Sequence, residues 1–246
     1  TNNPNYGHIN TWDTSQITDM SSLFNGKNTF NDDISNWNTS NATYMNSMFY
    51  GASSFNREIG NWDVGNVIRM DRMFQNATNF NGDISTWDVG NVITMSVMFS
   101  NVKTSISELN SWDVSKVKNM ENMFEGSYFN SPIGNWNTSN VTTMQNMFVG
   151  QRSNYPTGFN QDIGDWDVGN VTNLQKMFYY QHWFTQQSIN RWNINPNASM
   201  NNIFNNSVFN DILLDGEYWM NNTGAQNNAF YGTTGSIGST ALGDVP

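Results

Sequence analysis

The chain has 246 residues, with ten lysines and arginines against twenty aspartates and glutamates, and it contains no cysteine. A formal net charge of -10 argues against nucleic acid and anionic membrane surfaces as partners, because both attract basic patches. The missing cysteines exclude disulfides, thiolate metal sites and thiol nucleophiles. No apolar run approaches the roughly 18 residues of a membrane span, so we expect no membrane-spanning segment.

Tryptophan recurs along the chain at a nearly constant interval. The intervals are 25, 25, 25, 25, 24, 30 and 26 residues, and the tryptophans are Trp12, Trp37, Trp62, Trp87, Trp112, Trp136, Trp166 and Trp192. Counting slots from each of them, isoleucine or leucine occupies slot −3 and phenylalanine occupies slot +12, while slots +8 and +11 hold thirteen of the fourteen methionines. Such a period is the signature of a repeat architecture.

Each copy of the repeat combines two apolar periods. Trp62 and Val64 alternate as in a strand of three to four residues. The apolar residues that follow share one face of a short helix, and they are Val67, Met70, Met73 and Phe74. One copy cannot bury its own apolar stripe, so neighbouring copies must stack, with the eight tryptophans facing inward. We therefore predict an α/β repeat, a right-handed leucine-rich-repeat-like solenoid of about eight 25-residue turns with short parallel strands plus short helices.

The repeat defines two regions of the chain. Residues 1–210 are predicted to form the repeat solenoid, and residues 211–246 a C-terminal capping or assembly tail, because the period fades after Asn210. The end of a parallel stack exposes an unpaired edge, which such a tail can cover. At the other end the first turn is already in register at Ile9 and Trp12, so we expect no equivalent cap there.

Two segments carry a resemblance to a known family. Residues 80–95 read FNGDISTWDVGNVITM and residues 159–174 read FNQDIGDWDVGNVTNL. They resemble the BspA-like leucine-rich-repeat surface proteins of bacteria and mycoplasmas, and the resemblance covers roughly residues 6–210. It implies a secreted or surface-anchored protein that contacts host or matrix molecules or other cells. It implies no catalytic residues.

An acidic or amide side chain follows every repeat tryptophan. Asp63, Asp88 and Asp113 are consecutive, and on stacked strands they would lie roughly 5 Å apart as a candidate cation column. Because Ca²⁺ takes six or more oxygen ligands, we expect a solvated face and no metal or cofactor. Carboxylates at this spacing also resemble the pair of a retaining glycosidase, but the column repeats with the strand and singles out no pair. With His8 and His182 as the two histidines, neither a catalytic triad nor a three-histidine zinc site is expected, and we predict no enzyme.

A second polar column follows the second phenylalanine of most copies. It consists of Asn31, Asn56, Asn81, Asn130 and Asn160. Asparagine can bond local backbone groups where a corner needs donors and acceptors. We predict a structural ladder of side-chain amides.

Aromatic residues leave the core pattern in one region. Tyr155 lies in an insertion at residues 151–158, and Tyr179, Tyr180 and Trp183 lie in the next turn. Both segments follow the repeat phenylalanine, so they are predicted to emerge on one edge of adjacent turns. Tyrosine and tryptophan on irregular loops are typical of binding surfaces. The alternative is that they cover a gap left by the insertion.

The sequence thus favours an extracellular or cell-surface recognition or adhesion module without catalysis. The expected partner is a protein or glycan on another cell or in the matrix, and not nucleic acid. The alternative is a structural subunit of an extracellular filament or surface layer that assembles end to end with copies of itself.

Overall fold

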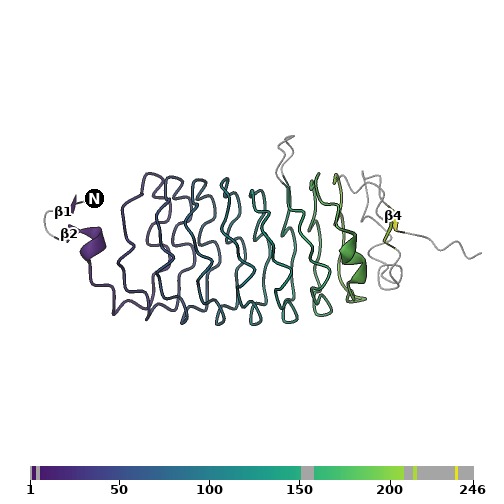
Figure 1. Ribbon diagram of the computed structural model, residues 1–246, viewed down its shortest axis with the longest axis horizontal. Helices are drawn as coiled ribbons and strands as arrows, with labels where there is room; N and C mark the ends of the chain where they lie inside the picture. Colours follow the sequence, from purple (N-terminus) through teal and green to yellow (C-terminus); the bar gives the residue numbers. More distant parts are fainter. Residues whose placement is uncertain (1, 4–5, 151–157, 208–212, 215–235, 238–246) are drawn as a thin grey trace, which may run out of the picture.

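The computed structural model describes residues 2–3, 6–150, 158–207, 213–214 and 236–237. Figure 1 shows the copies of the repeat as coils that lie side by side along the long axis of the molecule, in chain order. Seven isolated parallel bridges join slot +7 of successive coils, from Asp19–Tyr44 to Asn173–Ser199. Each inner coil is therefore held by the coil before it and the coil after it.

The regular elements that the structure describes are short. β1 (Asn2–Asn3) pairs antiparallel with β2 (Gly7–His8), which leads into the 3-10 helix η1 (Ile9–Thr11). A second 3-10 helix, η2 (Gln187–Arg191), precedes Trp192, and β3 (Leu213–Leu214) pairs in parallel with β4 (Ser236–Ile237). Most of the tail predicted at residues 211–246 lies outside the described residues, so its capping or assembly role stays a prediction.

The predicted α/β repeat, a right-handed leucine-rich-repeat-like solenoid with short parallel strands plus short helices, is wrong. Over the described part of the chain there is no α-helix, and no strand lies between residues 9 and 186. Trp62 and Val64 are buried, as their alternation indicated, but their backbone forms no strand. Successive coils meet instead at single bridges at slot +7, outside the segment predicted as a strand.

The predicted helix is absent because alternate amides point to the neighbouring coil. The N–H groups of Met70, Arg72 and Phe74 donate to carbonyls of the next coil at 3.2, 2.9 and 3.0 Å. Between them, the N–H of Met73 donates to the carbonyl of Met70, which closes a tight turn within the coil. An α-helix needs each N–H to reach the carbonyl four residues earlier, and these amides are already engaged. The spacing of three between apolar residues comes from consecutive turns.

Each of these turns requires a left-handed backbone. Slot +10 has a φ between 54° and 61° in all eight coils, at Ser22, Ser47, Arg72, Val97, Asn122, Asn146, Lys176 and Asn202. This region of φ favours glycine and asparagine and strongly disfavours β-branched residues. The turn could not be predicted from the sequence, because serine, arginine, valine and lysine in this slot do not indicate a positive φ.

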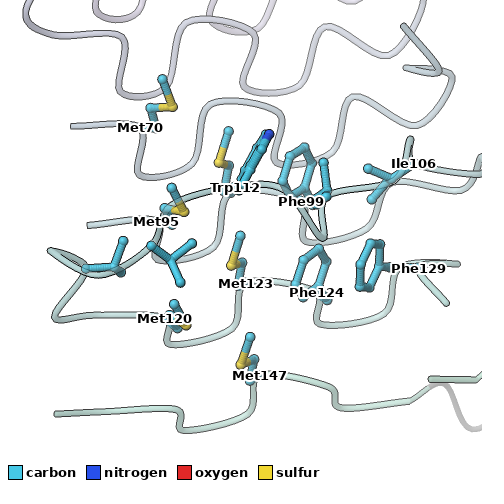
Figure 2. Packing of buried hydrophobic residues seen from close by; sticks show 14 of the residues in the cluster. Met70, Met95, Phe99, Ile106, Trp112, Met120, Met123, Phe124, Phe129 and Met147 are labelled. Atoms are coloured by element: carbon cyan, nitrogen blue, oxygen red, sulfur yellow. The ribbon is translucent and has the colours of Figure 1, made fainter. Parts of the chain in front are cut away.

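The interior is filled by columns of aromatic and methionine side chains (Figure 2). The ring centroid of Phe74 lies 5.5 Å from that of Phe49 and 5.7 Å from that of Phe99, in nearly parallel planes. Seven of the eight repeat tryptophans are at most 7% exposed, so their predicted inward orientation is confirmed. Trp12, in the first coil, is 41% exposed, and the prediction is wrong for that residue.

A hydrogen bond links every buried repeat tryptophan to the preceding coil. The indole Nε1–H donates to the carbonyl of slot −3 in that coil, at N–O distances between 2.8 and 3.2 Å. Trp12 has no preceding coil among the described residues and donates instead to the carbonyl of Tyr6, at 3.0 Å. Tyr6 also packs edge-on against Trp12, so this residue replaces part of a preceding coil.

The predicted amide ladder is confirmed on both sides of an interruption. The Asn31 side-chain oxygen accepts the backbone N–H of Asn56 at 2.9 Å, and Asn130 accepts that of Asn160 at 2.8 Å. In the fifth coil Ser105 is exposed, and Ile106, at 3% exposure, takes the core position that phenylalanine holds in its neighbours (Figure 2). The chain is shifted by one residue there, so the ladder has no asparagine in that coil.

Replacing Trp87 by alanine should destabilise the protein by about 3 to 5 kcal/mol, because it empties a core position between stacked coils. Trp87→Phe keeps an aromatic ring but removes the indole donor, so the Ile59 carbonyl keeps only the Trp62 N–H, at a cost of about 0.5 to 1.5 kcal/mol. Urea unfolding followed by fluorescence at 350 nm or by circular dichroism measures both. Equal losses for the two variants would show that the hydrogen bond, and not the packing, dominates.

Val97 is the β-branched residue among the left-handed slots, so Val97→Asn should stabilise the protein by roughly 1 kcal/mol. Asparagine already occupies this slot at Asn122, Asn146 and Asn202. The matched control is Ile93→Asn, which changes an exposed β-branched residue whose φ is not positive. Thermal melting should show a higher Tm for the first variant alone. A lower Tm for Val97→Asn would mean that its side-chain contacts outweigh the backbone strain.

Candidate functional site

The candidate cation column consists of tight turns rather than an acidic strand face. Asp63, Asp88 and Asp113 are exposed, and the Oδ1 of each accepts the backbone N–H two residues later, at 3.0, 3.0 and 2.9 Å. Asparagine does the same at Asn38 and Asn137. One oxygen of each side chain therefore closes its own turn. In the part of the chain that the structure describes, no three acidic or histidine side chains are grouped to hold a metal ion.

A further amide column holds these turns to their neighbours. The Nδ2 of Asn66 donates to the Ser40 carbonyl at 2.8 Å, and that of Asn91 donates to the Gly65 carbonyl at 2.7 Å. A Cβ on Gly65 would lie 3.3 Å from the Asp63 carboxylate and 3.6 Å from that of Asp88. The glycine thus makes room for carboxylates of two adjacent coils. These contacts explain why aspartate, glycine and asparagine recur together without a ligand.

The turns also shift the titration of their carboxyl groups. The hydroxyl of Ser115 and then its backbone N–H lower the pKa of Asp113, and the charge of Lys116 adds to the effect. The hydroxyl and backbone N–H of Ser15 lower the pKa of Asp13 in the same way. The charged form is favoured because both serine groups donate to it.

The predicted binding residues lie at one edge of the seventh coil. Tyr179 and Tyr180 pack edge-on with ring centroids 4.4 Å apart, and the Lys176 ammonium lies 5.6 Å from the centre of the Tyr179 ring. Trp183, three residues further on, is 50% exposed. We call Tyr179, Tyr180 and Trp183 the aromatic rim. Tyr155, the fourth predicted residue, lies outside the described residues.

The two ends of the insertion meet the aromatic rim. The Gly150 N–H donates to the Tyr179 carbonyl at 2.7 Å, and a Cβ on Gly150 would collide with the Tyr180 carbonyl. At the other end, a Cβ on Gly158 would lie 3.0 Å from the Trp183 ring. The structure therefore brings Tyr179, Tyr180 and Trp183 to the edge from which the insertion departs.

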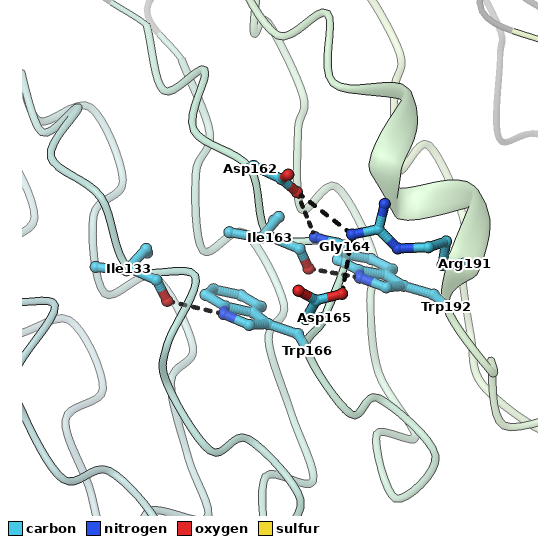
Figure 3. A network of polar contacts seen from close by, with 8 residues as sticks. All are labelled: Ile133, Asp162, Ile163, Gly164, Asp165, Trp166, Arg191 and Trp192. Carbon is cyan, nitrogen blue, oxygen red and sulfur yellow. Dashed lines mark hydrogen bonds and ion pairs between the residues drawn. The ribbon is translucent and has the colours of Figure 1, made fainter.

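The sequence did not predict an ion-pair network formed by residues that precede the repeat tryptophans in the chain. Arg191 lies between two carboxylates of the preceding coil, 2.9 Å from Asp165 and 3.9 Å from Asp162 (Figure 3). The Asp162 Oδ1 also accepts the Gly164 N–H at 2.9 Å. Spacing was the available signal, because Arg191 and Asp165 occupy slot −1 of successive coils and Asp162 occupies slot −4.

Acidification should destabilise the protein as the pH falls below about 4, where a free aspartate titrates. A lowered folded pKa contributes stability above the unfolded pKa, and this contribution is lost as the pH falls through the folded pKa. The double variant Asp13→Asn/Asp113→Asn keeps the turn acceptors but cannot titrate, so its Tm should drop less between pH 6 and pH 3. Calorimetry at both pH values measures this. Identical drops for variant and parent would show that these turns do not cause the acid sensitivity.

None of the helices that the structure describes is long and apolar enough to cross a membrane. No curated protein and no solved structure matches the chain. Two stretches, residues 1–108 and 93–215, match the model of a protein family described as "Mycoplasma protein of unknown function, DUF285". Because these matches together span the whole stack of coils, the chain belongs to the DUF285 family of Mycoplasma proteins.

Proposed function

We propose that the protein is a cell-surface or extracellular recognition module that adheres through the aromatic rim and performs no catalysis. The observation that carries the proposal is the exposed Trp183 together with the half-buried pair Tyr179 and Tyr180, at the edge of an otherwise regular stack. Tyrosine and tryptophan supply large contact areas at a small loss of conformational entropy, which is why they dominate binding hot spots. The partner is a protein or glycan on another cell or in the matrix.

Family and composition support a surface role. The chain belongs to a Mycoplasma repeat family, and its segments resemble BspA-like surface repeats. Its polar side chains are mostly neutral amides and hydroxyls, with 12% charged residues, and many of them bond the neighbouring coil. Because the side chains of these regular columns hold neighbouring coils together, the irregular edge is the part of the surface that supports recognition.

A second candidate function is end-to-end assembly into a filament or surface layer. It is favoured by the outer side of the first coil, where Ile17 is 41% and Leu23 is 44% exposed. The same slots are fully buried in the second coil, at Ala42 and Met48. An exposed apolar edge of a stack invites pairing with another chain. Negative-stain microscopy separates the candidates, because assembly gives rods that grow with concentration and are shortened by Leu23→Asp.

The adhesion proposal predicts that a variant without the rim stays folded but loses binding. The variant Tyr179→Gln/Tyr180→Asn/Trp183→Asn carries the residues that the third coil has in the same slots, Gln75, Asn76 and Asn79. Asn76 also shares the positive φ of Tyr180, so the exchange imposes no backbone strain. Beads coated with the parent should adhere to cultured epithelial cells, and beads with the variant should adhere at least roughly tenfold less, the effect expected for losing hot-spot residues.

The matched control replaces Asp63, Asp88 and Asp113 by asparagine, which preserves the turns and should preserve adhesion. Loss of adhesion in this control, with normal adhesion of the rim variant, would place the contact on the acidic column instead. Unfolding of the rim variant would show that the aromatic side chains only cover the insertion.

A further inference from the structure

A polar hollow of about 730 Å³ opens on the side of the fourth to sixth coils that precedes the repeat tryptophans. Its wall includes two carboxylates, Asp83 and Glu108, together with the short polar side chains Thr86, Ser111 and Asn135. The remaining lining is also formed by serine and asparagine. The volume is in the range of ordinary ligand sites, but every lining residue is of a polar type, whereas such sites are usually lined by apolar and aromatic residues.

The chemistry of the wall selects a ligand rich in hydrogen-bond donors. Carboxylates accept only, whereas hydroxyl and amide groups supply acceptor oxygens as well as donors. No ion pair among the described residues involves Asp83 or Glu108. The Asp83 Oδ1 accepts the Ser85 N–H at 2.9 Å, which lowers the pKa of Asp83 together with the Ser85 hydroxyl and keeps this carboxylate charged. A guanidinium group, with five N–H donors and no acceptor, is the side chain that complements such a wall.

The same molecule already holds a guanidinium in the equivalent place three coils away. Arg191, in slot −1, reaches back to Asp162 and Asp165 in slots −4 and −1 of the preceding coil (Figure 3). In the fifth coil, slot −1 is Ser111, whose hydroxyl donates to the Ser85 carbonyl at 3.1 Å. In the coil before it, slot −4 is again acidic, Asp83, while slot −1 is the neutral Thr86. Serine is too short to fill the space that arginine fills beside Asp162.

The next pair of coils repeats this arrangement. Glu108 occupies slot −4 of the fifth coil, and Asn135 occupies slot −1 of the sixth coil. Both line the polar hollow, and asparagine again stands where the eighth coil has arginine. Two adjacent acidic positions therefore lack the internal cation that the seventh coil has.

The hollow adjoins the irregular coil. Ile106 takes the core position one residue late, so it lies three positions instead of four before the slot −3 residue, Leu109. Within this shortened segment, the Ser107 hydroxyl accepts the backbone N–H of Ile84 in the preceding coil at 3.2 Å. The departure from the repeat thus lies at the polar hollow itself, and departures from regularity are where repeat proteins place specific contacts.

We propose that the polar hollow binds an arginine side chain of a partner protein, held by Asp83 and Glu108, which occupy the slot of Asp162 in two successive coils. This site is separate from the aromatic rim, so it stands or falls independently of the adhesion proposed above. The class of ligand is an exposed, arginine-bearing polypeptide segment. It reaches the hollow from solvent, since Asp83, Thr86, Glu108 and Ser111 are all exposed.

The test measures fluorescence anisotropy of a labelled tetra-arginine peptide with the intact protein at low salt. Asp83→Asn/Glu108→Gln should weaken binding by at least about tenfold, the effect of losing charge-assisted hydrogen bonds. The matched control is Asp33→Asn/Glu58→Gln, which removes the same two charges from slot −4 of the second and third coils, outside the hollow. Its affinity should fall much less. Equal losses in the two variants would reduce the attraction to the overall negative charge and overturn the proposal.

A variant that fills the hollow and a lysine peptide test the same site in two further measurements. Ser111→Arg, which places a guanidinium in the slot of Arg191, should block the peptide while the thermal melt stays normal. A tetra-lysine peptide should bind several-fold more weakly than tetra-arginine, because the ammonium lacks the planar pair of donors. Normal binding to folded Ser111→Arg, or equal affinity for the lysine peptide, would contradict an arginine site. The rim variant should bind tetra-arginine as the parent does.

Discussion

The stack depends on a hydrogen bond between an indole and a carbonyl that the repeat reproduces in every described coil after the first. A tryptophan in this position carries both a large apolar surface and a polar donor, and burial of the donor is costly unless it finds an acceptor. The acceptor is the slot −3 carbonyl of the preceding coil, at 3.1 Å for Trp87 and Ile59. Because donor and acceptor belong to different coils, the bond forms only when the coils are in register. The tryptophan therefore sets the register and fills the core at once.

The other polar columns follow from that register. Once the coils are aligned, asparagine amides meet carbonyls of the neighbouring coil, as Asn91 meets Gly65, and alternate backbone amides do the same along the turns after slot +7. Few residues need to be charged, because backbone and amide groups satisfy one another. Residues outside these regular columns are therefore less constrained in type. The aromatic rim lies beside the insertion, and the polar hollow lies beside the coil whose core residue, Ile106, is shifted by one position.

The sequence was sufficient to predict what lies inside but not how the backbone runs. Periodicity identified the core correctly, since Phe74, Met70 and Trp87 are buried at slots +12, +8 and 0. It failed on secondary structure, because apolar residues three apart suit a helix and a series of tight turns equally well. The deciding feature is the left-handed backbone at slot +10. Residues such as Arg72 and Val97 occupy this slot, and their types do not indicate a positive φ. The interaction between Arg191 and Asp162 was hidden because it joins residues 29 positions apart in a chain.

The hydrogen bond between a repeat tryptophan and the preceding coil depends on the slots of the two residues and not on the number of residues between them. The interval between Trp136 and Trp166 is 30 residues, yet the Trp166 indole still reaches the Ile133 carbonyl at 3.0 Å. Extra residues after the repeat phenylalanine leave this bond intact. Core and loop sequence can consequently change at different evolutionary rates, so one scaffold can present new loops without any redesign of its interior.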